Sequence, residues 1–292
     1  MGRLSLSVSM TEERISMDLQ ALSGIEGFTA TSLLITTGIC LAAVFVAWYT
    51  VRSRIQFSQV ILGLFSYVLV MLLENVFSLL GLQAGLGHSG LGYGLFLTAS
   101  IVVSRELIRA VSVKLVLQPR FDGADAALGF GLGFGGFYLL TCAAYYFNCY
   151  TTVNQFLSVG ADSFFSSMDQ GTQEAYDLLQ AIAGQNGWQY IMTAINRVFF
   201  LTREMAFSLL VWYGLSDEKA RWCLIAVPVM QFAAMLPDSL QSALVLTNTY
   251  LKDAITYVIS GGILFLSAKV YNSREDQVAH FQVEKLRARR RR

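Results

Sequence analysis

Apolar runs of about 20 residues recur along this chain, and they constrain its fold more than any other feature. A helix needs about 20 such residues to cross a bilayer, and it satisfies its backbone polar groups internally. Only 14% of the 292 residues are charged, against about 25% in ordinary soluble domains. The sequence therefore predicts an all-α polytopic transmembrane helix bundle. The seven predicted spans are residues 30–51, 58–81, 92–117, 124–147, 190–214, 221–246 and 250–271.

Lysine and arginine are distributed unevenly between the predicted loops. The loops after the first, third and fifth spans carry Arg52, Arg54, Arg120, Lys219 and Arg221. The segment 148–189 contains neither lysine nor arginine, although it holds four acidic residues. Because short basic loops remain cytoplasmic, this pattern predicts an N-terminus outside and a C-terminus inside. We expect a multi-pass protein of the plasma membrane, in a prokaryotic cell.

Three regions follow from these spans. Residues 1–29 form a polar to amphipathic segment without the pattern of a cleavable signal. The transmembrane domain is residues 30–271, with an external acidic loop at 148–189 and a short helix expected near 174–183. Residues 272–292 are a basic cytoplasmic tail, expected to contact anionic lipid. Membrane lipids are thus an expected partner, whereas nucleic acid is not.

Charged residues lie in the middle of two spans. Arg105, Glu106 and Arg109 are central in the third span, and Arg203 and Glu204 are central in the fifth. An ionised side chain at the bilayer centre costs from about 3 to more than 10 kcal/mol, so it is kept with a partner or for a function. Glu106 reaches Arg109 at a spacing of i+3 on one helix. The sequence leaves open whether Glu106 pairs with Arg109 or with Arg203.

Residues of three other spans lie at or near this depth. Phe134 and Gln231 each lie ten residues into their spans, and Glu74 lies in the outer half of the second span. Arg197 and Glu204 are seven residues apart and share a helix face. Two interpretations remain: a buried ion-pair network that fixes helix register, or a functional site in the membrane.

The fourth span contains a glycine run from Gly129 to Gly136. It has the formal GxGxxG spacing, but no strand precedes it, which argues against dinucleotide binding. Its GxxxG pairs predict close packing of helix backbones. Alternatively, the glycines clear space beside the charged layer for a substrate or a partner helix. Because His88 and His280 lie outside the spans, we expect no histidine-based metal site, and we expect no cofactor.

The order of these motifs resembles the YhfC family of intramembrane proteases, relatives of the type II CAAX prenyl endopeptidases. That family has an E-E-x-x-R helix, a G-x-G-H-G-G-x-E helix, an E-R helix and an H-x-x-x-N-x-P helix. The likeness covers most of the chain and is clearest over residues 92–136 and 195–237. In this superfamily the first glutamate of E-E-x-x-R activates water, and histidines hold the developing oxyanion.

Most of the reactive residues that the resemblance implies are replaced in this chain. Glu106 and Arg109 match the first motif, and the proline of the last motif is kept as Pro237. The replaced positions are Arg105, Phe134, Tyr138, Asn196, Gln231 and Met235. The resemblance therefore implies the scaffold of an intramembrane protease with little of its chemistry.

Three functions are compatible with these observations. The favoured one is a catalytically degenerate protein that binds a transmembrane segment, as a protein partner, or a lipid-like ligand in the former active-site cavity. An active peptidase would need Glu106 or Glu204 as its base, because an arginine remains protonated and cannot accept a proton. A small transporter would use the midplane charges as a substrate path.

Overall fold

The computed structural model describes residues 22, 25–83, 90–121, 123–166, 172–242 and 245–290. Most of the predicted N-terminal segment 1–29 lies outside these residues. Every regular element in the described part is a helix, and seven helices are long and apolar enough to cross a membrane. The prediction of an all-α bundle with seven spans is confirmed.

The spanning helices in chain order are α2 (Gly27–Val51), α3 (Phe57–Gln83), α4 (Leu91–Ser112), α5 (Asp125–Val159), α8 (Gly187–Ser216), α9 (Cys223–Ser242) and α10 (Thr249–Arg290). A π-helical turn, Val113–Leu117, continues α4 toward the next loop. Two short helices, α6 (Ala161–Ser166) and α7 (Thr172–Ala183), lie between α5 and α8. Helix α7 coincides with the short helix expected near 174–183.

Two helices extend far beyond the predicted spans. Helix α5 continues past residue 147 to Val159 and ends at Gly160, whose φ of 79° is a left-handed conformation that glycine adopts readily. Helix α10 continues through the predicted tail to Arg290. Hydropathy identifies only the apolar part of a helix. The helix can continue into polar residues beyond the bilayer, which hydropathy does not detect.

The chain forms two compact units, and three of the spanning helices contribute to both. The first unit comprises residues up to Ala42 together with Leu140–Ile195. Its core is rich in aromatic rings, with Phe156 and Phe164 packed edge to face at 5.6 Å between centroids. This unit includes the N-terminal half of α2, the C-terminal half of α5, both short helices and the start of α8.

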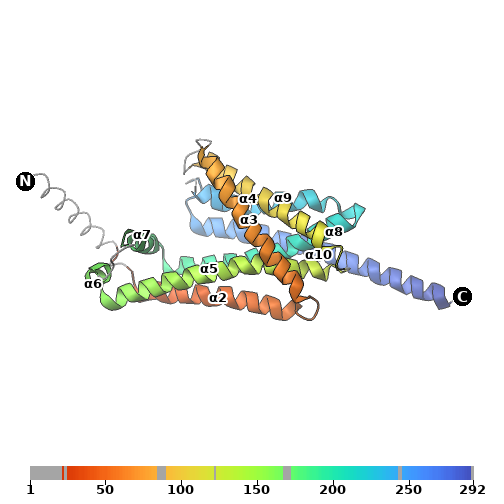
Figure 1. The fold of residues 1–292 in the computed structure, drawn as a ribbon, viewed down its shortest axis with the longest axis horizontal. Helices are drawn as coiled ribbons and strands as arrows, with labels where there is room; N and C mark the ends of the chain where they lie inside the picture. Colours follow the sequence, from red (N-terminus) through yellow and green to blue (C-terminus); the bar gives the residue numbers. More distant parts are fainter. Residues whose placement is uncertain are drawn as a thin grey trace, which may run out of the picture. The chain divides into compact units, whose positions relative to one another are not determined.

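The second unit comprises Ala43–Leu139 and Asn196–Arg292, and it contains the predicted charged layer. In this unit α4 packs against both α3 and α9, and α9 packs against α10 (Figure 1). Buried hydroxyls join α4 to its neighbours: Ser112 contacts Ser66 of α3 at 2.9 Å, and Thr98 contacts Ser239 of α9. In α9, Pro228 and Pro237 each remove a backbone N–H donor from the helix.

The glycine run allows α5 to approach two neighbouring helices at backbone distance. A Cβ atom on Gly133 would collide with the carbonyl of Val60 in α3, and one on Gly63 would collide with the carbonyl of Phe130 in α5. A Cβ on Gly131 would lie 2.6 Å from the Cα of Met205 in α8. The close-packing interpretation of this run is therefore confirmed.

Candidate functional site

The centre of the charged layer is Arg109 of α4, whose side chain is completely buried. Its guanidinium donates to Oε1 of Glu106 at 2.5 Å, one turn earlier on the same helix. It also donates to Oε2 of Glu204 on α8. The sequence left the partner of Glu106 open, and the structure assigns it to Arg109. One arginine thus joins carboxylates from two helices.

Arg105 extends this network to a third helix. Its Nε donates to Oε1 of Glu74 on α3 at 3.0 Å, and its terminal nitrogen lies 3.8 Å from Oε1 of Glu204. We call Glu74, Arg105, Glu106, Arg109 and Glu204 the ion-pair cluster. Within it, two guanidinium groups contact three carboxylates, and all members except Glu74 are buried.

Aromatic rings surround both guanidinium groups of the ion-pair cluster. The guanidinium carbon of Arg109 lies 5.1 Å from the ring centre of Phe134 and 5.6 Å from that of Phe207. The guanidinium of Arg105 lies 5.1 Å from Phe200 and 5.9 Å from Tyr67. Ring faces attract such cations and shield them from competing ligands. Phe134, the position matched to a family histidine, is thus part of the packing around Arg109.

The remaining predicted positions on α8 contact other partners. Arg203 donates to the hydroxyl of Ser260 at 3.2 Å, Arg197 donates to the hydroxyl of Tyr138, and Asn196 donates to Asp253 at 2.7 Å. Ser260 and Asp253 of α10 were not among the residues predicted from the sequence. The signal was available, because α10 carries buried polar residues at helical spacing within an apolar span. They are Asp253, Thr256, Ser260 and Ser267.

Gln231 of α9 is 2% exposed, and neither its amide nitrogen nor its amide oxygen has a hydrogen-bond partner in the described part of the chain. Oε2 of Glu106 is likewise buried without a partner. Thr98 of α4 contacts Ser239 of α9. Glu106 lies eight residues after Thr98 in α4, and Gln231 lies eight residues before Ser239 in α9. Because the two helices are antiparallel, both residues lie about 12 Å from this contact in the same direction. The two incompletely paired groups therefore share one level of the bundle. Met235, one turn from Gln231, is partly buried.

This arrangement favours holding charge over transferring protons. Each carboxylate of the ion-pair cluster contacts at least one guanidinium, and these contacts are charge-assisted hydrogen bonds. Among the buried side chains at this level, Gln231 through both amide atoms, Glu106 through Oε2 and Arg109 through Nε have polar atoms without a hydrogen-bond partner in the described part of the chain.

Comparison with family models matches residues 38–256 to the model described as YhfC intramembrane metalloprotease. Comparison with curated proteins and with solved structures gives no match.

Proposed function

Because the chain belongs to the YhfC intramembrane metalloprotease family, we propose that it uses this family's membrane scaffold to bind without cleaving. Its ligand is a transmembrane segment of another protein or a lipid-like molecule, held beside the ion-pair cluster. The protein works in the plasma membrane of a prokaryotic cell, with its N-terminus outside and its basic C-terminal end in the cytoplasm.

The donor set does not fit the metal ion that the family description implies. A catalytic zinc site needs about three ligands from histidine, cysteine, aspartate or glutamate, with one position left open. Among the described residues, no group of three or more such side chains is placed to hold a metal ion. The carboxylates of the ion-pair cluster instead contact Arg105 and Arg109, whose positive charges repel a divalent cation.

The observation that carries the proposal is the double contact of Arg109 with Glu106 and Glu204. A general base has to accept a proton near neutral pH and reach the attacking water. Glu106 and Glu204 are the two most buried carboxylates of the ion-pair cluster, and each already accepts a hydrogen bond from Arg109. This pairing supports an ion-pair cluster with a structural role over one that activates water.

The unpaired amide of Gln231 supports ligand binding. A buried amide without a hydrogen bond costs about 1 to 3 kcal/mol in proteins, so a ligand that completes its bonds gains that energy. A peptide unit offers one N–H donor and one C=O acceptor, which complement the two amide atoms. Oε2 of Glu106, at the same level, is a further acceptor for an N–H or O–H group.

A cleavage assay tests the catalytic part of this proposal. The purified protein is reconstituted in vesicles with a fluorogenic transmembrane peptide, and the wild type is compared with Glu106→Gln. We expect no cleavage above that of protein-free vesicles for either protein. Cleavage by the wild type that disappears in Glu106→Gln would identify an active peptidase and contradict the proposal.

Photocrosslinking tests the binding part. A photoreactive phenylalanine derivative replaces Gln231 in one variant and Val258, a 77% exposed residue of α10, in a control variant. We expect adducts at position 231, and their mass distinguishes a protein segment from a lipid. If position 231 gives no more adduct than position 258, nothing binds beside the ion-pair cluster and the proposal fails.

A further inference from the structure

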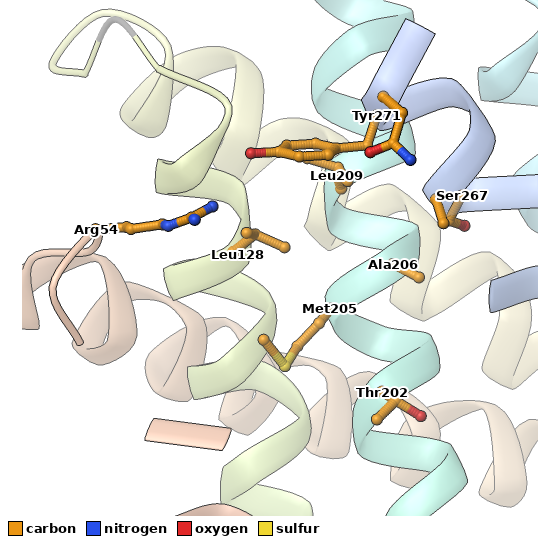
Figure 2. Close-up of a pocket in the computed structure, with 10 residues that line it drawn as sticks. Arg54, Leu128, Thr202, Met205, Ala206, Leu209, Ser267 and Tyr271 are labelled. Atoms are coloured by element: carbon orange, nitrogen blue, oxygen red, sulfur yellow. The ribbon is translucent and has the colours of Figure 1, made fainter. Parts of the chain in front are cut away.

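A second candidate site lies away from the ion-pair cluster, in an open hollow of about 320 Å³ between α5, α8 and α10 (Figure 2). Its volume is at the lower end of the range of about 300 to 1,000 Å³ that is typical of ligand pockets. The residues that line it are Arg54, Leu128, Thr202, Met205, Ala206, Leu209, Ser267, Ala268, Tyr271 and Asn272. All of them belong to the second unit.

The wall of the hollow is apolar in its chemistry. Leu128, Met205 and Leu209 present hydrocarbon or thioether groups. The hydroxyl of Thr202 bonds to carbonyls of its own helix, and so does that of Ser267. Because these two hydroxyls already donate within their own helices, the wall offers a ligand mainly dispersion contacts. It suits a hydrocarbon chain.

One end of the hollow is polar and positively charged. Arg54 comes from the loop between α2 and α3, and Figure 2 shows it at the same end as Tyr271 of α10. No carboxylate in the described part of the chain pairs with the Arg54 guanidinium, and its side chain is exposed. The nearby Arg52 differs, because its guanidinium lies 4.1 Å from the ring centre of Tyr49.

The hollow follows α8 from the middle of its span toward the basic loops. Thr202 is adjacent to Arg203, in the middle of the predicted span, and Leu209 lies about 10 Å further along α8. Arg54 then marks the end of the hollow at the basic loops. The hydrocarbon thickness of one leaflet is about 15 Å, half of the bilayer core. An acyl chain lying along α8 would therefore place its headgroup near Arg54.

We propose that this hollow binds an anionic phospholipid, with an acyl chain against α5, α8 and α10 and its phosphate on Arg54. Anionic lipids are recognised by basic residues between transmembrane helices on the cytoplasmic side. The positive-inside rule places the loop of Arg54 on that side. The lining stripe Thr202, Met205, Ala206 and Leu209 lies on the opposite face of α8 from Glu204. This site is therefore separate from the ion-pair cluster and from the function proposed for it.

Lipid binding to the detergent-purified protein tests the proposal. Dioctanoyl phosphatidylglycerol, which is anionic, is compared with dioctanoyl phosphatidylcholine, which is zwitterionic, by native mass spectrometry and by the shift in Tm. We expect tighter binding of phosphatidylglycerol by the wild type. Arg54→Ala should weaken that binding about fivefold, the effect of one basic residue at an anionic surface. The control Arg52→Ala should change it less than about twofold, since its guanidinium is already held against the ring of Tyr49.

A second pair of variants tests the acyl-chain part of the site. Ala268 of α10 is exposed and lines the hollow, so Ala268→Phe should fill it and weaken binding of both lipids. Ala254→Phe places the same ring at an exposed position of α10 outside the hollow and should leave binding unchanged. Equal affinity for the two lipids would overturn the proposal. So would equal effects of Arg52→Ala and Arg54→Ala, or unchanged binding to Ala268→Phe.

Discussion

Arg109 is completely buried, and its charge is balanced by groups that reach it from two helices. Burying ions is costly, and their mutual attraction offsets that cost only when the remaining donors and acceptors are also satisfied. Removing one partner of such a pair therefore lowers stability more than replacing both partners by apolar residues. The aromatic rings of Phe134 and Phe207 add to the constraint, because they exclude water from the guanidinium.

We predict that Arg109→Met lowers the free energy of unfolding by about 3 to 5 kcal/mol, because it leaves Glu106 buried without its ion-pair partner and Glu204 with Arg105 alone. Reversible unfolding in mixed micelles measures the change. The control is Arg221→Ala, since Arg221 pairs with Glu218 at an exposed site and should have little effect. The double variant Arg109→Met with Glu204→Gln should recover part of the loss; no recovery would contradict this account.

We predict opposite effects for the same substitution at two buried glutamines. Gln231→Leu should raise the free energy of unfolding by about 1 kcal/mol in the ligand-free protein, because it removes two unpaired polar atoms. Gln59→Leu should lower it, because Oε1 of Gln59 accepts a hydrogen bond from the backbone N–H of Gln56 at 2.9 Å. Thermal unfolding of both variants checks the signs; a destabilised Gln231→Leu would show that its amide is already satisfied.

The sequence predicted the composition of the charged site better than its pairing. Mid-span position and i+3 spacing were enough to bring Arg105, Glu106 and Arg109 into one layer with Glu204. Which acceptor each arginine contacts depends on the rotation of α4 and α8 about their axes, which composition does not determine. The aromatic rings around the guanidiniums were missed for the same reason: an apolar span offers many rings, and packing selects a few.

Among the helices, α5 approaches its neighbours in the second unit at backbone distance. Its glycines remove side chains where the backbones of α3 and α8 pass closest. Gly131 and Gly135 contact α8 around Met205 and Glu204, so the same glycines that pack the helix also position a member of the ion-pair cluster. The sequence predicted this close packing because GxxxG spacing places the glycines on one face of the helix, where a neighbouring backbone can approach.

We predict that Gly133→Ala lowers the free energy of unfolding by about 1 to 3 kcal/mol, since its methyl group would collide with the backbone of α3 and separate the two helices. Gly136→Ala is the control in the same run. Its Cβ would lie 3.7 Å from Val44, an ordinary contact, so alanine there should be neutral or stabilising. Unfolding in denaturing detergent compares the two; equal destabilisation would contradict backbone contact at Gly133.

At the scale of the whole molecule, the number of spans was predictable because lipid leaves the backbone few alternatives. Runs of about 20 apolar residues can cross the bilayer as helices, and hydropathy identified the seven that the described part of the chain contains. The ends of α5 and α10 were not predictable in this way, since helix continues there without an apolar requirement. The orientation of the chain in the membrane rests on the basic residues of the loops.

We predict that cysteines introduced at two exposed positions differ in labelling by a membrane-impermeant maleimide on intact cells. Gln185→Cys, at an exposed position between α7 and α8, should be labelled because the positive-inside rule predicts that this segment lies outside. Ser53→Cys, between Arg52 and Arg54, should be labelled only after the membrane is permeabilised. The four native cysteines are replaced by alanine as background. Labelling of Ser53→Cys alone on intact cells would reverse the orientation.

The contact between Arg109 and Glu204 joins residues that are 95 positions apart in the chain, and this separation has a consequence for synthesis. At about 5 to 20 residues per second, the ribosome makes Glu204 roughly 5 to 20 s after Arg109. Glu74 and Glu106 are available as soon as α4 is made, so they neutralise the first charges that enter the membrane. Helix α8 then arrives with a carboxylate whose two cationic partners are already in place.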